Sequence, residues 1–175
     1  MAVKDILKLG DPRLYSKSEA VLKAEWKTIN GIVEDLHDTM MDFRNKYHAG
    51  RAIAAPQIGV MKRMIYMNVD QPEILINPVL TFPDEETMEI WDDCMSFPDL
   101  LVKVNRFTRC VLQYVDKDGN LQVKHLEGDL AELIQHEYDH LEGILAVDRA
   151  IDSHSFALKS AAVNPTLKNR NGRTN

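Results

Sequence analysis

The segment His136-Glu137-Tyr138-Asp139-His140 constrains this chain more than any other part of its sequence. In a helix, residues four positions apart share one face, so the two histidines can bind a single metal ion. Glu137 would lie close to that ion, where it could accept a proton from an activated water and later return it. The pattern therefore predicts a helix with a metal site, the alternative being two histidines on an ordinary helix face.

We expect this helix to run from Asp129 to about Leu141. Asp129 and Glu132 have the spacing of an N-cap and its reciprocal partner, and Gly143 suits the left-handed conformation that ends many helices. An earlier helix is expected over residues 25–47. Its apolar residues recur in steps of three and four, which places them on one face: Ile29, Ile32, Val33, Leu36, Met40 and Phe43.

Short segments rich in β-branched and apolar residues separate the two helices and predict strands. They cover residues 64–69, 74–82, 87–90, 100–104, 109–115 and 121–125. Asp118-Gly119 lies between the last two segments, which indicates a hairpin. The expected fold class is α+β, with antiparallel or mixed sheets packed on a central metal-binding helix.

Length and composition favour one compact domain. The chain has 175 residues, of which 45% are hydrophobic, enough for a core without disulfide bonds. We expect this domain to cover residues 1–163 and the polar residues 164–175 to form a mobile tail. The net charge of −6 argues against nucleic acid and anionic membranes as partners. With two cysteines, Cys94 and Cys110, and no long apolar segment, we expect a cytoplasmic protein.

A catalytic metal usually needs a third protein ligand and an open position. Two common protease arrangements are excluded, because Ala146 stands where a third histidine would extend the motif and no glutamate follows Glu142. The remaining candidates lie upstream: Cys94, His37, His48, His125 and His154. Cys94 follows polar residues near the expected end of a strand, but a small buried thiol is an equally good interpretation. For Cys110, inside an apolar strand, the structural role is favoured.

Three blocks of sequence, one of which contains the paired histidines, indicate a particular protein family. They are Gly50-Arg51-Ala52-Ile53-Ala54-Ala55-Pro56-Gln57, Asp92-Asp93-Cys94-Met95-Ser96 and Gln135-His136-Glu137-Tyr138-Asp139-His140-Leu141-Glu142-Gly143. Together they resemble the motifs of bacterial-type peptide deformylases, with a divergent cysteine block, and weaker similarity extends from Ile6 to about Asp148. Members of that family remove the formyl group from the N-terminal formyl-methionine of new proteins. The resemblance therefore implies a metal-dependent amide hydrolase.

The resemblance also implies roles for individual residues. Cys94, His136 and His140 would bind one divalent ion, natively Fe2+, with Zn2+, Ni2+ or Co2+ as alternatives. Glu137 would transfer the proton, while the Gln57 side chain and the Met95 backbone N–H would stabilise the oxyanion. The residues placed against the substrate are Gly50, Arg51, Ala52, Asp92, Asp93 and Leu133. Arg106 would support the site by pairing with Asp92, the alternative being a solvated strand residue.

Several residues depart from the family pattern. Ala52 replaces the second glycine of its block, a change that matters only if that position needs a positive φ. Asp92 and Asp93 replace a glutamate and a glycine, and a second carboxylate beside the thiolate would favour metal retention but oppose an anionic substrate end. Asp129 stands near an apolar family position that borders the methionine pocket, although a helix cap is the favoured interpretation.

These departures from the family pattern affect which substrate the protein is expected to accept. A formylated peptide or nascent chain is the expected partner, which would bring the enzyme close to the ribosome. One alternative is a related amidase that acts on a different formylated amine. Another is a non-catalytic relative that keeps the metal as a structural staple and binds processed N-termini.

Overall fold

The computed structural model describes residues 2–161 of the chain. The predicted tail, residues 164–175, and the last two residues of the predicted domain lie outside the described residues. The two α-helices are α1 (Ile29–Tyr47) and α2 (Asp129–Leu141). The strands are β1 (Ala52–Ala54), β2 (Met64–Asn68), β3 (Pro72–Thr81), β4 (Thr87–Cys94), β5 (Phe97–Phe107), β6 (Arg109–Val115), β7 (Leu121–Glu127) and β8 (Phe156–Leu158). Short 3-10 helices are η1 (Pro12–Tyr15), η2 (Lys23–Thr28), η3 (Ala55–Ile58), η4 (Ala146–Arg149) and η5 (Lys159–Ala161).

The strands form two antiparallel sheets. The larger sheet has five strands in the order β1-β2-β3-β6-β7, and the smaller has three in the order β4-β5-β8. Strand β3 pairs directly with β6, so the chain leaves the larger sheet after β3, forms the β4–β5 hairpin and returns. The α+β class is thus confirmed, and the sheets are antiparallel.

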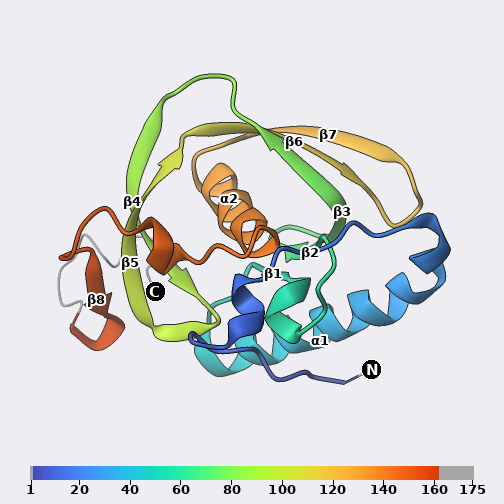
Figure 1. Ribbon diagram of the computed structural model, residues 1–175, viewed down its shortest axis with the longest axis horizontal. Helices are drawn as coiled ribbons and strands as arrows, with labels where there is room; N and C mark the ends of the chain where they lie inside the picture. The colour runs from blue at the N-terminus through green and yellow to red at the C-terminus, as the bar shows by residue number, and fades with distance from the viewer. Residues whose placement is uncertain (1, 162–175) are drawn as a thin grey trace.

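Helix α2 lies in the middle of the molecule, with β6 and β7 on one side, the β4–β5 hairpin on another and α1 below (Figure 1). Ten of its thirteen residues are buried. Ile134 and Leu141 pack with residues of the larger sheet, among them Ile65 and Leu112. Because the helix is covered on several sides, its polar side chains must find partners inside the protein.

The ends of α2 confirm one prediction and correct another. Gly143 has a φ of 73°, and a Cβ there would lie 2.6 Å from the backbone oxygen of Tyr15, so glycine is required where the helix ends. At the other end, the N-cap is Gly128, and no side chain caps the helix. The prediction of Asp129 as the N-cap is therefore wrong. Asp129 is the first helical residue, and its carboxylate pairs with Arg51.

The first predicted helix is confirmed from Ile29 onward. Residues 25–28 belong instead to η2, a 3-10 helix that leads into α1. The buried face of α1 carries Leu36, Met40 and Phe43, which pack against Ile53 and other residues of the larger sheet. This packing holds α1 beneath the segment that carries the first sequence block.

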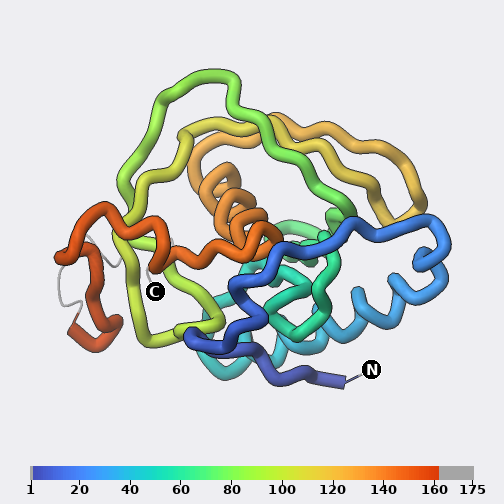
Figure 2. Tube along the Cα trace, viewed as in Figure 1, coloured from blue at the N-terminus to red at the C-terminus, as the bar shows by residue number. Residues whose placement is uncertain are grey.

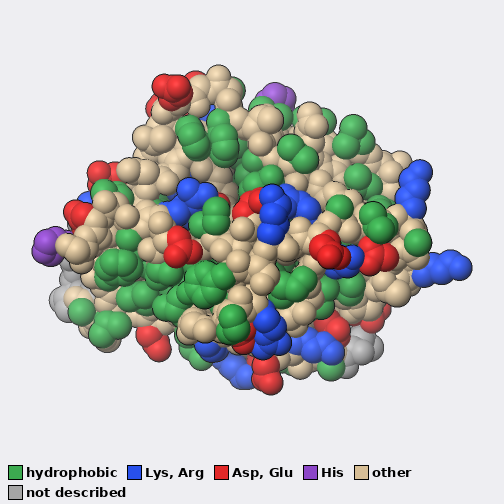
Figure 3. Space-filling view, viewed as in Figure 1, with side chains coloured by type: hydrophobic (Ala, Val, Ile, Leu, Met, Phe, Trp, Pro, Cys, Tyr) green, Lys and Arg blue, Asp and Glu red, His purple; other side chains and the backbone are tan. Residues whose placement is uncertain are grey.

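The surface carries both signs of charge. On the face shown in Figure 3, acidic and basic side chains are interspersed, and neither sign covers a continuous area. Within residues 2–161, no helix has the length and apolar character needed to cross a membrane.

Candidate metal centre

Strand β4 and helix α2 bring Cys94, His136 and His140 together. Cys94 is the last residue of β4, and the histidines lie one turn apart on α2. Among the described residues, these three form the one group of potential ligands whose donor atoms all lie within 4.8 Å of one another. Cys94 Sγ lies 3.2 Å from His140 Nε2. All three are buried, and a thiolate with two imidazoles fits zinc or iron(II) with a fourth position open.

Hydrogen-bond donors surround the cysteine sulfur. The backbone N–H of Ser96 lies 3.5 Å from Cys94 Sγ, and Gln57 Nε2 lies 3.6 Å from it. Gln57 is buried, and its Oε1 accepts a 2.9 Å hydrogen bond from the backbone N–H of Ala54. This bond orients the Gln57 amide, so that its Nε2 is presented to the centre as a donor.

A buried ion network supports His136. Asp92 Oδ1 lies 2.9 Å from His136 Nδ1, and Asp92 Oδ2 accepts a 2.8 Å hydrogen bond from Arg106 Nη2. Arg106 also pairs with Asp139. Burial by itself would raise the pKa of Asp92, but His136 and Arg106 outweigh this effect and hold that pKa below its usual value. The carboxylate on Nδ1 leaves Nε2 of His136 available to a metal.

The network decides between the two interpretations of Arg106. Its side chain is 2% exposed and lies between Asp92 and Asp139, so the solvated strand residue is excluded. Asp92 borders the pocket, but its two carboxylate oxygens face Arg106 and His136. The expected contact between this carboxylate and a substrate therefore does not fit the geometry.

Glu137 is buried beside the two histidines. Its Oε2 has no hydrogen-bond partner within the part of the chain that the structure describes. Burial raises the pKa of Glu137 to about 7, an effect that the positive charge of His136 opposes and that Asp92 and Glu132 reinforce. A carboxyl group with such a pKa can both accept and donate a proton near neutral pH.

The centre opens into a pocket of about 640 Å³. The predicted site residues along its wall are Gly50, Arg51, Ala52, Gln57, Asp92, Asp93, Cys94, Met95, Leu133, His136 and Glu137. Gly50 has a φ of 119°, a conformation that favours glycine. Ala52 lies in β1 and is not among the residues with positive φ, so its replacement of a glycine introduces no backbone strain.

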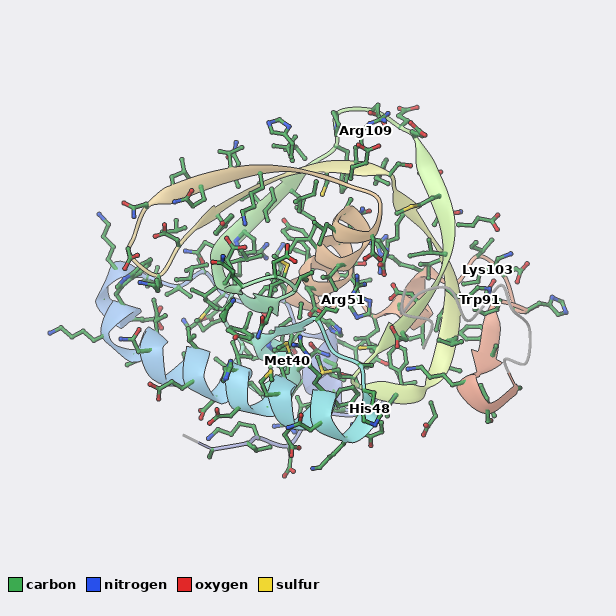
Figure 4. All side chains as sticks on the ribbon, turned by 180° about the vertical axis from the view of Figure 1, so that it is seen from behind. Met40, His48, Arg51, Trp91, Lys103 and Arg109 are labelled. Carbon is green, nitrogen blue, oxygen red and sulfur yellow. The ribbon has the colours of Figure 1, made fainter. Side chains whose placement is uncertain are left out.

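Charged side chains form part of the pocket wall. Arg51 projects beside α2 (Figure 4), where it pairs with Asp129 and lies 3.4 Å from Glu132 Oε2. On another side, Asp93 pairs with Lys159 Nζ at 2.7 Å, so the added carboxylate is matched by a positive charge. Asp129 also lines the pocket, which agrees with the alternative interpretation that it lies at the substrate pocket.

Two supporting residues of this centre were not predicted from the sequence, Asp139 and Lys159. Asp139 lies within the histidine motif, and it accepts hydrogen bonds from Arg149 at 2.5 and 2.6 Å in addition to its pair with Arg106. Lys159 was also missed, because it lies 66 residues from its partner Asp93. An acidic residue inside a largely buried helix could have indicated a buried pair for Asp139. Lys159 carries no comparable signal.

Comparisons with known proteins agree with this geometry. The family model described as polypeptide deformylase matches residues 3–156. Peptide deformylase 1 of Prochlorococcus marinus is 41% identical over 169 residues, covering 89% of this chain and 85% of its own. The peptide deformylase of Pseudothermotoga lettingae is 34% identical over 161 residues, covering 92% and 91%.

Solved structures give the same result. The crystal structure of peptide deformylase from Thermotoga maritima matches with a TM-score of 0.79 and 31% identity, covering 87% of this chain and 100% of that one. A Synechococcus elongatus peptide deformylase in complex with actinonin matches with a TM-score of 0.78 and 30% identity, covering 86% and 80%. With its sequence, fold and Cys-His-His cluster in agreement, this chain belongs to the polypeptide deformylase family.

Proposed function

We propose that this protein is a metal-dependent hydrolase that removes the formyl group from the N-terminal formyl-methionine of newly made proteins and releases formate. The observation that carries the proposal is the buried cluster of Cys94, His136 and His140, with Glu137 beside it, at a pocket open to substrate. Family membership supports the same reaction. A divalent ion held by the three ligands would polarise the formyl carbonyl and activate water, and we propose Fe2+ as the native ion, with Zn2+, Ni2+ or Co2+ as alternatives.

Glu137 is the proposed proton carrier. Its burial and its pKa of about 7 suit a group that takes a proton from water and gives it to the departing amine. We assign no other role to Glu137, because the three neighbouring ligands already supply the donor set.

Gln57 and Met95 are proposed to stabilise the negative charge that develops on the formyl oxygen. The amide of Gln57 is held by Ala54, so its N–H donors need no reorientation when charge appears. Met95 follows Cys94 directly and lines the pocket, which supports a contribution from its backbone N–H.

The substrate backbone is proposed to run along Gly50 and β1. Strand β1 forms an edge of the larger sheet, and an edge strand can pair with an extended peptide. Arg51, Ala52 and Leu133 would then lie against the substrate, and Asp93 would contact it at the rim. We propose that residues 1–163 act as one catalytic domain in the cytoplasm, on chains leaving the ribosome.

A second candidate function is supported by the charged wall of the pocket. Arg51, Asp129 and Glu132 stand where an apolar surface would suit methionine better. This feature favours a different formylated amine as substrate. Formate release from formyl-Met-Ala-Ser and from non-peptide formamides separates the two: a large preference for the formamides would displace the main proposal.

Glu137→Ala tests the catalytic proposal. The iron form of the wild type, prepared without oxygen, is expected to release formate from formyl-Met-Ala-Ser, and the variant is expected to be slower by about 10² to 10⁴. Glu127→Ala, at an exposed position at the end of β7, is the matched control and should retain wild-type activity. Equal formate release by wild type and Glu137→Ala would refute the role of Glu137. A wild type that binds formylated peptides without releasing formate would favour a non-catalytic relative.

A further inference from the structure

The segment formed by residues 6–9, here called the clamp segment, contacts both η3, which carries Gln57, and the turn between β4 and β5, which carries Ser96. It runs beside the turn between β4 and β5 (Figure 2). The backbone N–H of Leu7 donates to the carbonyl of Gln57 at 2.8 Å, and the backbone N–H of Leu9 donates to the carbonyl of Ser96 at 3.0 Å. Gln57 lies 50 positions after Leu7, and Ser96 lies 87 positions after Leu9, so one short segment links two distant parts of the chain.

Apolar contacts fix the clamp segment in place. Ile6 packs against the core cluster that contains Met40 and Met95, and Leu7 packs against the cluster that contains Cys94 and Phe97. The two side chains enter different parts of the core, so the residues after them cannot shift without disturbing both.

Among residues 6–9, only Lys8 has a side chain that donates a hydrogen bond to a residue beside the metal centre. Its Nζ donates to the carbonyl oxygen of Met95 at 3.1 Å. This carbonyl belongs to the peptide group that joins Met95 to Ser96. The N–H of the same peptide group points at Cys94 Sγ, 3.5 Å away.

A cation on the carbonyl side of a peptide group strengthens the donor on its other side, because hydrogen bonds in series polarise one another. Lys8 therefore does two things for the Met95–Ser96 peptide. It restrains the orientation of that peptide, and it strengthens the N–H donor that faces the sulfur of Cys94. The structure gives the ammonium group no hydrogen bond to the sulfur, and Lys8 is not among the residues that line the pocket.

We infer that Lys8 is a positioning residue for this centre, which acts by holding the Met95–Ser96 peptide against Cys94. The inference rests on the proposed function, in which the Met95 N–H stabilises the developing oxyanion. That N–H belongs to the Cys94–Met95 peptide group, which directly precedes the group that Lys8 binds. Small displacements of groups that align a reaction are costly, and loss of a direct oxyanion donor lowers kcat by about 10² to 10³. Lys8 binds the neighbouring peptide group and not the oxyanion donor itself, so its loss should have a smaller effect.

The test compares Lys8→Met, Lys8→Arg and Lys4→Met. Lys8→Met keeps most of the apolar stem and removes the donor, whereas Lys8→Arg keeps a cationic donor. Lys4→Met is the matched control, because Lys4 lies on the same N-terminal stretch but pairs with Asp35 on α1 at 3.2 Å. Each variant is assayed on formyl-Met-Ala-Ser per bound metal ion, with its melting temperature and metal content measured alongside.

We expect Lys8→Met to lower kcat by about fivefold to tenfold with KM within about twofold, and Lys8→Arg to recover most of the loss. The melting temperature of Lys8→Met should match that of Lys4→Met. A purely structural role would instead lower the melting temperature or the metal content and leave kcat per bound metal unchanged. That result, or a Lys8→Met variant equal to Lys4→Met in kcat, would overturn the inference.

A spectroscopic measurement tests Lys8 without the reaction. In the cobalt(II) form, the sulfur-to-metal charge-transfer band should shift in Lys8→Met and stay unchanged in Lys4→Met. If the wild type releases no formate, the proposed function fails, yet the band still decides whether Lys8 acts on Cys94. If the wild type is active and the band is the same in both variants, the inference on Lys8 fails and the proposed function stands.

Discussion

Replacing Arg106 with methionine is expected to destabilise the protein by about 3–5 kcal/mol, the usual cost of removing one partner from a buried ion pair. Arg106 is buried and lies between Asp92, at 2.8 Å, and Asp139. Asp139 retains two hydrogen bonds from Arg149, at 2.5 and 2.6 Å. Asp92 retains His136, so we expect its weakly compensated charge to account for most of the loss.

Thermal unfolding of the metal-free protein measures this loss. In a chain of this size, 1 kcal/mol corresponds to about 2–4 °C, so the melting temperature should fall by about 6–20 °C. Arg109→Met is the matched control, because Arg109 also pairs with two carboxylates, those of Asp84 and Glu86. Its side chain is 40% exposed and lies at the periphery of the molecule (Figure 4), so this variant should lose at most about 1 kcal/mol.

A second substitution separates the unpaired charge from lost packing. Asp92→Asn added to Arg106→Met should recover part of the stability, because the buried carboxylate is no longer left without its guanidinium. The same network should influence metal affinity, since a group that orients a ligating histidine contributes about tenfold to a hundredfold. If Arg106→Met and Arg109→Met lost equal stability, the reasoning from burial would be refuted.

Three other predictions follow from separate features. Gln57→Leu should lower kcat by about 10² to 10³ with KM little changed, and an equal effect on both parameters would argue against oxyanion stabilisation. Gly143→Ala should cost about 2–4 kcal/mol in denaturant unfolding, from the positive φ and the contact with the Tyr15 backbone, and an unchanged midpoint would contradict this. Burial raises the pKa of Cys110 from 9.0 to about 11, so its stabilising contribution is complete below pH 9 and is lost as the pH rises to about 11. Mass spectrometry after iodoacetamide treatment at pH 8 should therefore find Cys110 unmodified in the folded protein, and rapid labelling would oppose the assignment.

The parts of the fold that the sequence predicts well are those with local signals. The apolar periodicity of α1 and the Asp118-Gly119 turn between β6 and β7 depend on neighbouring residues, and both elements are found in the structure. Strand β8 has three residues and pairs with β5 over Leu100–Val102, a distant partner that no local pattern indicates.

The residues of the metal centre also differ in whether a local sequence signal predicts them. The spacing of His136 and His140 is a local signal, whereas the choice of Cys94 among upstream candidates needed the family resemblance. The prediction of Asp129 as the N-cap was wrong because the helix begins one residue earlier than the pattern implied, with Gly128 as the N-cap, and the Asp129 carboxylate pairs with Arg51, 78 residues away. The burial of Arg106 depends equally on distant residues, so the sequence left its two interpretations open.

The direct pairing of β3 with β6 has a consequence for how the protein responds to its surroundings. The larger sheet is complete without the β4–β5 hairpin. Cys94 therefore reaches the histidines of α2 from a hairpin that lies between β3 and β6 in the sequence but outside that sheet. An ion bound by Cys94 and the two histidines would therefore favour, by mass action, the packing of the β4–β5 hairpin against α2. Each tenfold rise in free ion above its Kd would add about 1.4 kcal/mol to that packing, in addition to the ion pairs of Arg106 with Asp139 and of Asp92 with His136, so the stability of this part of the protein would depend in part on the concentration of free metal ion.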